Sequence, residues 1–99
     1  MVVGVLRIEL RLFEVQSLKQ KRSQVSRILN RVRSRYPVSA AEVGCLDLLQ
    51  RSRLGLSMTA GSEAQIQSVF RKLEEDLYQS GQAELLASDV EYLHYGEKN

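Results

Sequence analysis

Three cations stand at the start of a predicted helix, where their spacing could bind an anion. Ser17-Leu18-Lys19-Gln20 has the pattern of a capping box, in which the serine accepts from a first-turn N–H and the glutamine reaches back. Lys19, Lys21 and Arg22 therefore fall within five residues of the cap. Because a helix N-terminus is electropositive, cations are unfavourable there, and such a misfit is typical of a functional site. The N–H groups and the three cations together predict a site for phosphate or another anion.

The rest of this helix is also basic. Arg27, Arg31 and Arg35 recur every four residues, which separates them by about 6 Å along the helix axis. Arg33 lies on another flank, with Lys19 and Arg22. We expect these side chains to contact the phosphates of structured RNA or of the ribosome. The predicted contacts are Lys19, Lys21, Arg22, Arg27, Arg31 and Arg35, with Gln50 and Arg51 as secondary candidates.

Charge is unevenly distributed along the chain. Residues 1–36 carry nine Lys or Arg and two Glu, a net charge of +7, whereas residues 37–99 have a net charge of −5. No acidic residue stands between Glu14 and Glu42. This asymmetry indicates an anionic partner. The alternative is a solvated face balanced by the carboxylates of Glu74, Glu75 and Asp76, and if these left no open basic surface the nucleic-acid interpretation would fall.

The elements that position these residues follow from hydrophobic periodicity. Alternation predicts strands over residues 2–13 and 51–60. A run of small residues predicts another over 38–43, and an apolar run predicts the last over 83–95, where Ser88 and Asp89 indicate a bulge or kink. One helix follows the first capping box and ends before Pro37, and another runs from a second box at residues 62–65 to Gly81. The order βαββαβ predicts a single α+β domain over residues 1–99, a ferredoxin-like antiparallel four-stranded sheet with two helices on one face. The expected buried stripe of the first helix is Leu18, Val25, Ile28, Leu29, Val32 and Tyr36.

The other face of such a sheet has no cover. Apolar residues are expected there and form a predicted interface with a partner or a second copy of the chain: Val3, Val5, Phe13, Leu93 and Tyr95. Scattered surface apolars are the alternative and need no partner. The second candidate function is therefore a protein-interaction or homo-oligomerisation module. The strand over residues 53–59 has no aromatic side chain, so base stacking of the RNA-recognition-motif kind is not expected.

The sequence lacks the residues that zinc binding, phosphate-loop binding and acylphosphatase activity require. One histidine, His94, and one cysteine, Cys45, cannot build a Cys/His zinc site within one chain, and no Gly-rich phosphate loop is present. Acylphosphatases share the predicted fold, but residues 13–16 lack the glycines of their phosphate cradle. We therefore expect no enzyme, cofactor or metal. No run of about 18 apolar residues predicts a membrane span, and a single cysteine fits a cytoplasmic protein.

Four segments together resemble a known family. They are residues 3–10 (Val-Gly-Val-Leu-Arg-Ile-Glu-Leu), residues 17–22 (Ser-Leu-Lys-Gln-Lys-Arg), residues 38–43 (Val-Ser-Ala-Ala-Glu-Val) and residues 47–55 (Asp-Leu-Leu-Gln-Arg-Ser-Arg-Leu-Gly). In these the chain is similar to the YlxP-like family of small bacterial proteins of unknown function. The resemblance implies a ferredoxin-like fold and genes that often lie beside those for translation and ribosome maturation factors. It implies no established activity.

Overall fold

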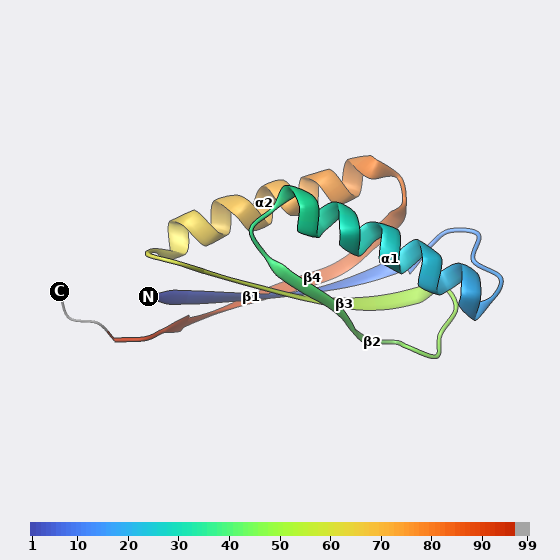
Figure 1. Cartoon of the computed structure of the whole chain (residues 1–99), viewed down its shortest axis with the longest axis horizontal. Helices are drawn as coiled ribbons and strands as arrows, with labels where there is room; N and C mark the ends of the chain where they lie inside the picture. The colour runs from blue at the N-terminus through green and yellow to red at the C-terminus, as the bar shows by residue number, and fades with distance from the viewer. Residues whose placement is uncertain (97–99) are drawn as a thin grey trace.

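The computed structural model describes residues 1–96. Its elements are β1 (Val2–Leu12), α1 (Leu18–Arg35), β2 (Ser39–Gly44), β3 (Arg51–Ala60), α2 (Glu63–Ser80) and β4 (Ala83–His94). The strands form one antiparallel sheet in the order β2-β3-β1-β4. Both helices lie on the same side of this sheet (Figure 1). The predicted ferredoxin-like α+β fold is confirmed.

The core lies between the helices and the sheet. Along β1, Leu6, Ile8, Leu10 and Leu12 are buried, because period-two alternation turns them all toward the helices. Leu54 and Leu56 of β3 lie opposite Ile8 and Leu6 in the register and are buried with them. From the helices the core receives Val25, Ile28, Leu29, Val32, Ile66, Phe70, Leu73 and Leu77.

Side chains begin both helices where the capping boxes predict. Ser17 Oγ accepts from the backbone N–H of Gln20 at 3.1 Å, and Gln20 Oε1 accepts from the N–H of Gln16 at 2.8 Å. The return contact therefore reaches the residue before the cap. Tyr36 is the C-cap of α1, directly before Pro37, and Gly81 ends α2 with a φ of 70°. These caps fix where α1 begins and ends over the sheet.

Two local predictions are wrong. Leu18 is 40% exposed, and Lys21, one turn further into the helix, is buried on that stripe in its place. The irregularity of β4 is at Leu86, because Glu9 pairs with Ala87 while Leu10 pairs with Leu85. Ser88 and Asp89 stay in regular register, where Asp89 lies opposite Arg7 and forms an ion pair with it. No helix within residues 1–96 is long and apolar enough to cross a membrane.

Candidate nucleic-acid interface

Lys21, predicted as a phosphate contact, is inside the protein. Its side chain is 2% exposed, its ammonium donates to the carbonyl of Cys45, and Nζ lies 3.3 Å from Glu42 Oε2. The same Glu42 oxygen accepts from the hydroxyl of Ser52 at 2.7 Å. A buried ammonium needs such partners, because an unpaired charge in the interior is very costly. Lys21 therefore ties α1 to β2 and β3, and its prediction as a phosphate contact is wrong.

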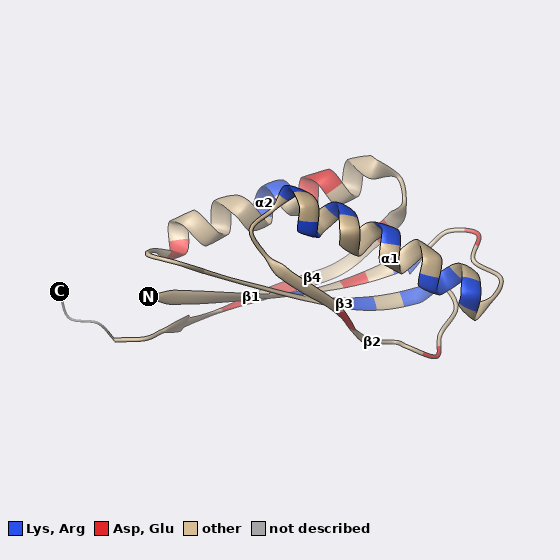
Figure 2. Ribbon diagram, in the orientation of Figure 1, with Lys and Arg blue, Asp and Glu red and all other residues tan. Residues whose placement is uncertain are grey.

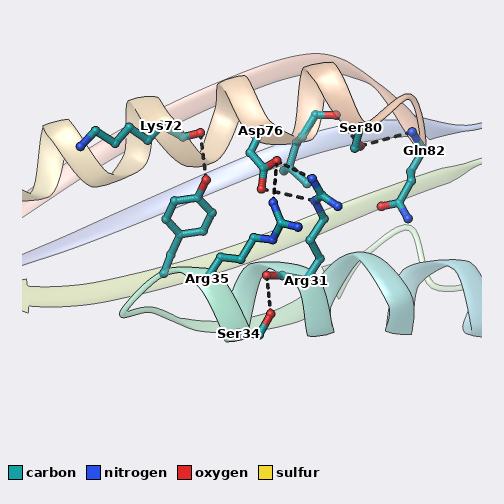
Figure 3. Close-up of polar contacts among 9 residues, drawn as sticks. Arg31, Ser34, Arg35, Lys72, Asp76, Ser80 and Gln82 are labelled. Carbon is teal, nitrogen blue, oxygen red and sulfur yellow. Dashed lines mark hydrogen bonds and ion pairs between the residues drawn. The ribbon is translucent and has the colours of Figure 1, made fainter.

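Arg31 and Arg35 turn toward α2. Arg31 donates to both carboxylate oxygens of Asp76, at 2.6 Å and 3.3 Å, and Arg35 Nη1 lies 3.4 Å from Oδ1 (Figure 3). The hydrogen bonds from Arg31 lower the pKa of Asp76 below its ordinary value. Next to them, the hydroxyl of Tyr36 donates to the carbonyl of Lys72 at 3.3 Å, and burial raises the pKa of Tyr36. The charges of these two arginines are thus balanced by Asp76 of the second helix, which is the alternative that the sequence leaves open.

Arginines on the open sheet face are also paired. Glu9 accepts from Arg51 at 2.9 Å and from Arg53, and these hydrogen bonds lower the pKa of Glu9, that from Arg53 most. Arg7 donates to both oxygens of Asp89, at 2.9 Å and 3.0 Å. Arg11 pairs with Glu84. Arg51 therefore belongs to a set of ion pairs on the open face of the sheet, away from α1. The predicted contacts are not brought together on one surface.

The predicted contacts that remain exposed and unpaired lie on α1. Lys19, Arg22 and Arg27 are exposed and form no ion pair with a carboxylate of residues 1–96. Arg33 is also exposed. Its guanidinium donates hydrogen bonds to the backbone carbonyl of Ala40 and forms no ion pair with a carboxylate of residues 1–96. We call these four residues the basic outer face of α1. Figure 2 shows basic residues along the whole helix, which contains no acidic residue.

Arg33 is not among the predicted contacts, although the helical spacing places it on the same flank as Lys19 and Arg22. Gln50 directly precedes β3, and Arg51 is the first residue of that strand and pairs with Glu9 on the open face of the sheet. The sequence therefore located the basic helix correctly. It misjudged which of its cations face outward.

The predicted apolar interface is split between two ends of the sheet. Val3 lies opposite Leu93 in the register, Val5 is the next residue on the same face, and Tyr95 follows β4. Phe13 follows the other end of β1, about 30 Å away at the rise of an extended strand. The ion pairs of the open face lie between Phe13 and the other four residues, so Phe13 is not part of the same patch. Figure 1 shows the two ends of β1 at opposite ends of the sheet.

The sequence has one histidine and one cysteine, and each has its own contacts in the structure. No group of three or more His, Cys, Asp or Glu side chains within residues 1–96 could hold a metal ion. His94 contacts the carboxylate of Glu63 on the surface. Cys45 is half-buried with a φ of 60°, and its carbonyl accepts from Lys21.

Fold and surface together define a small ferredoxin-like α+β domain with a basic first helix. The chain belongs to the family described as "Protein of unknown function (DUF503)", which matches residues 3–90. It is 31% identical over 72 residues to "Uncharacterized protein YlxP" of Bacillus subtilis (strain 168), which covers 73% of this chain and 78% of that protein. The resemblance to the YlxP-like family is thereby confirmed.

One solved structure with a similar fold is described as "Structure of the REP associates tyrosine transposase bound to a REP hairpin". It has a TM-score of 0.49 and 12% sequence identity to this chain. The match covers 95% of this chain and 57% of the transposase chain, so this protein spans little more than half of that length. At this level of similarity nothing follows about what this protein binds.

Proposed function

We propose that this protein is a non-enzymatic binding module that contacts the phosphates of structured RNA through the basic outer face of α1, in ribosome assembly or translation. One observation carries the proposal. The arginines of the open sheet face have carboxylate partners, and so do Arg31 and Arg35, which pair with Asp76 of α2, whereas Lys19, Arg22 and Arg27 have none among residues 1–96. Charges that the protein leaves unpaired on one surface favour an anionic partner.

The position of Lys19 and Arg22 strengthens this surface. Both stand near the Ser17 cap, and the first turn of α1 contains no acidic residue. The positive end of the helix dipole adds to their field there instead of being compensated. This is the arrangement that attracts phosphate groups to helix N-termini. The burial of Lys21 removes one cation from the predicted cluster but leaves the other two exposed.

The geometry supports backbone recognition over base recognition. Lys19 and Arg33 are 14 residues apart, which places them about 21 Å from each other along the helix axis. A helix face of that length can follow several phosphates of an RNA duplex, which proteins recognise mostly by shape and backbone contacts. The open face of the central strands β1 and β3 carries valine, arginine, glutamate and small side chains and no aromatic residue for base stacking.

The proposal is tested by the salt dependence of binding to a hairpin of ribosomal RNA. Replacing Lys19, Arg22 and Arg27 together by alanine should weaken binding and flatten the slope of log K against log salt by about 2 to 3, at roughly 0.7–0.9 per phosphate contact. A matched control, Arg7→Ala/Arg51→Ala/Arg53→Ala, removes the same charge from the open sheet face. Equal losses in both triple variants, or a wild-type affinity independent of salt, would count against the proposal.

A further inference from the structure

The edge of the sheet at β4 is long and unpaired by any strand of the described chain. Tyr95 donates its N–H to the carbonyl of Met1 at 2.9 Å, and the Met1 amino group donates to the carbonyl of Tyr95 at 3.4 Å. In an antiparallel ladder, hydrogen-bonded and non-hydrogen-bonded pairs alternate. Counting back from this pair, Leu93 and Glu91 bond inward to β1.

The intervening residues of β4 therefore present their backbone to the outside. Ser88, Val90 and Tyr92 direct N–H and C=O groups away from β1, toward a free edge. Such a row of backbone groups is a template for another strand unless it is blocked.

The opposite edge of the sheet is blocked in several ways. β2 has six residues, follows Pro37 closely, and loses regular register between Glu42 and Gly44. The guanidinium of Arg33 also occupies the carbonyl of Ala40. These are devices by which proteins protect edge strands. From residue 87 to residue 94, β4 has no proline, lysine or bulge.

The carboxylates of Asp89 and Glu91 do not block the free edge of β4 either. The carboxylate of Asp89 is held by both nitrogens of the Arg7 fork, over the open face of the sheet. The pKa of Arg7 is raised by its hydrogen bond to Asp89 and by the charges of Asp89 and Glu91. The negative charge of Asp89 is therefore balanced by Arg7 of β1, and its carboxylate points toward the centre of the sheet and away from the free edge.

Apolar side chains flank the free edge on both faces. On the helix side, Val90 is 43% exposed and lines a groove beside α2 with Leu6, Phe70 and Tyr92. On the open side, Leu93 is 46% exposed. An added strand would cover both side chains while bonding to the outward backbone groups.

We propose that the occupant of this edge is a second copy of the chain, paired β4 to β4 in antiparallel orientation about a two-fold axis. Like charges placed directly opposite one another are destabilising, and this excludes some registers and permits others, among them one with the axis at Tyr92. An axis at Val90 sets Asp89 against Glu91 of the second copy, and an axis at Glu91 sets that residue against itself. An axis at Tyr92 sets Glu91 against Leu93 and Val90 against His94, so no two acids are directly opposed. A two-fold interface is self-complementary in this way and closes at two copies.

This pairing is independent of the RNA proposal, because α1 covers the β2 side of the sheet and α2 the β4 side. It is tested by sedimentation velocity over a range of concentrations. Wild type should sediment with twice the mass of one chain. Val90→Lys places a charge in the interface, and Val90→Pro removes an outward N–H that has no bonding strand among residues 1–96. Both should lose the dimer and retain the far-ultraviolet circular dichroism of the wild type, whereas Val43→Lys, on the exposed β2 side, should remain dimeric.

Amide hydrogen exchange supplies the second readout. In the wild-type dimer the N–H of Tyr92 should be protected, and in Val90→Lys that protection should be lost while the inward N–H of Glu91 stays protected. The proposal is overturned if wild type is monomeric throughout, as it would be if the edge served a peptide of another protein. It is equally overturned by a dimer that survives both Val90 variants, or by a dimer in which the Tyr92 amide exchanges freely.

Discussion

Removing the charge of Glu42 should destabilise the whole domain, because that carboxylate is the only anionic partner of the buried Lys21 ammonium within residues 1–96. Glu42→Gln keeps the shape of the side chain and its contact with Ser52, so the lost ion pair is the main change. Unpairing a buried charge costs about 3–5 kcal/mol, and the 18% exposure of the Glu42 side chain favours the lower end, about 3 kcal/mol.

That magnitude is large for a domain of this size. At about 4–8 °C per kcal/mol, a loss of about 3 kcal/mol lowers the melting temperature by roughly 12–24 °C. Urea unfolding followed by circular dichroism, compared with thermal melts, measures both quantities. Glu14→Gln is the matched control, because Glu14 is exposed without an ion pair to residues 1–96, and its change should stay within about 0.5 kcal/mol.

A double-mutant cycle separates pairing from other effects. Lys21→Met removes the ammonium, and in Lys21→Met/Glu42→Gln neither partner is charged, so much of the stability should return. A Glu42→Gln variant as stable as wild type would refute the reasoning. So would strictly additive losses in the double variant, because additivity means that the two side chains do not interact.

Two further changes test the core and the contact between the helices. Gly4→Ala should cost about 1–3 kcal/mol, because its Cβ would lie 2.4 Å from Ile66 Cγ2, whereas Gly96→Ala, with nothing within 4 Å, should be nearly neutral in urea unfolding. Arg31 holds the pKa of Asp76 below 3.8, so this pair stabilises the fold above that pH and loses its effect as pH falls through the lowered value. The stability gap between wild type and Asp76→Asn should therefore be largest near neutral pH and shrink in strong acid; a gap that stays constant or grows on acidification contradicts the assignment.

Local signals were sufficient to predict the fold. Strict alternation marked β1, two serine caps opened the helices, and Pro37 and Gly81 closed them, so the element order followed without tertiary information. Each of these signals acts within a few residues of the chain, which is why a single sequence contains it. The bulge of β4 was misplaced because register depends on the partner strand, here through the Arg7–Asp89 pair.

The candidate site was only partly predictable for the same reason. Lys21 stands four residues before Val25 and seven before Ile28, a spacing that places it on the buried stripe, but its charge argued for the surface. Its partner Glu42 comes from another element, and no local pattern connects the two. The same holds for Glu9, which pairs with arginines 42 and 44 residues further along the chain. Which cations stay unpaired is a property of the tertiary structure.

The most direct test of phosphate binding by α1 is a nuclear magnetic resonance titration of the labelled protein with a structured RNA hairpin at low salt. The account predicts that the amide shifts concentrate at the start of α1 and around Lys19, Arg22 and Arg27, and that they reverse when salt is added. Shifts confined to the open sheet face, or a spectrum that does not change at saturating RNA, would contradict it.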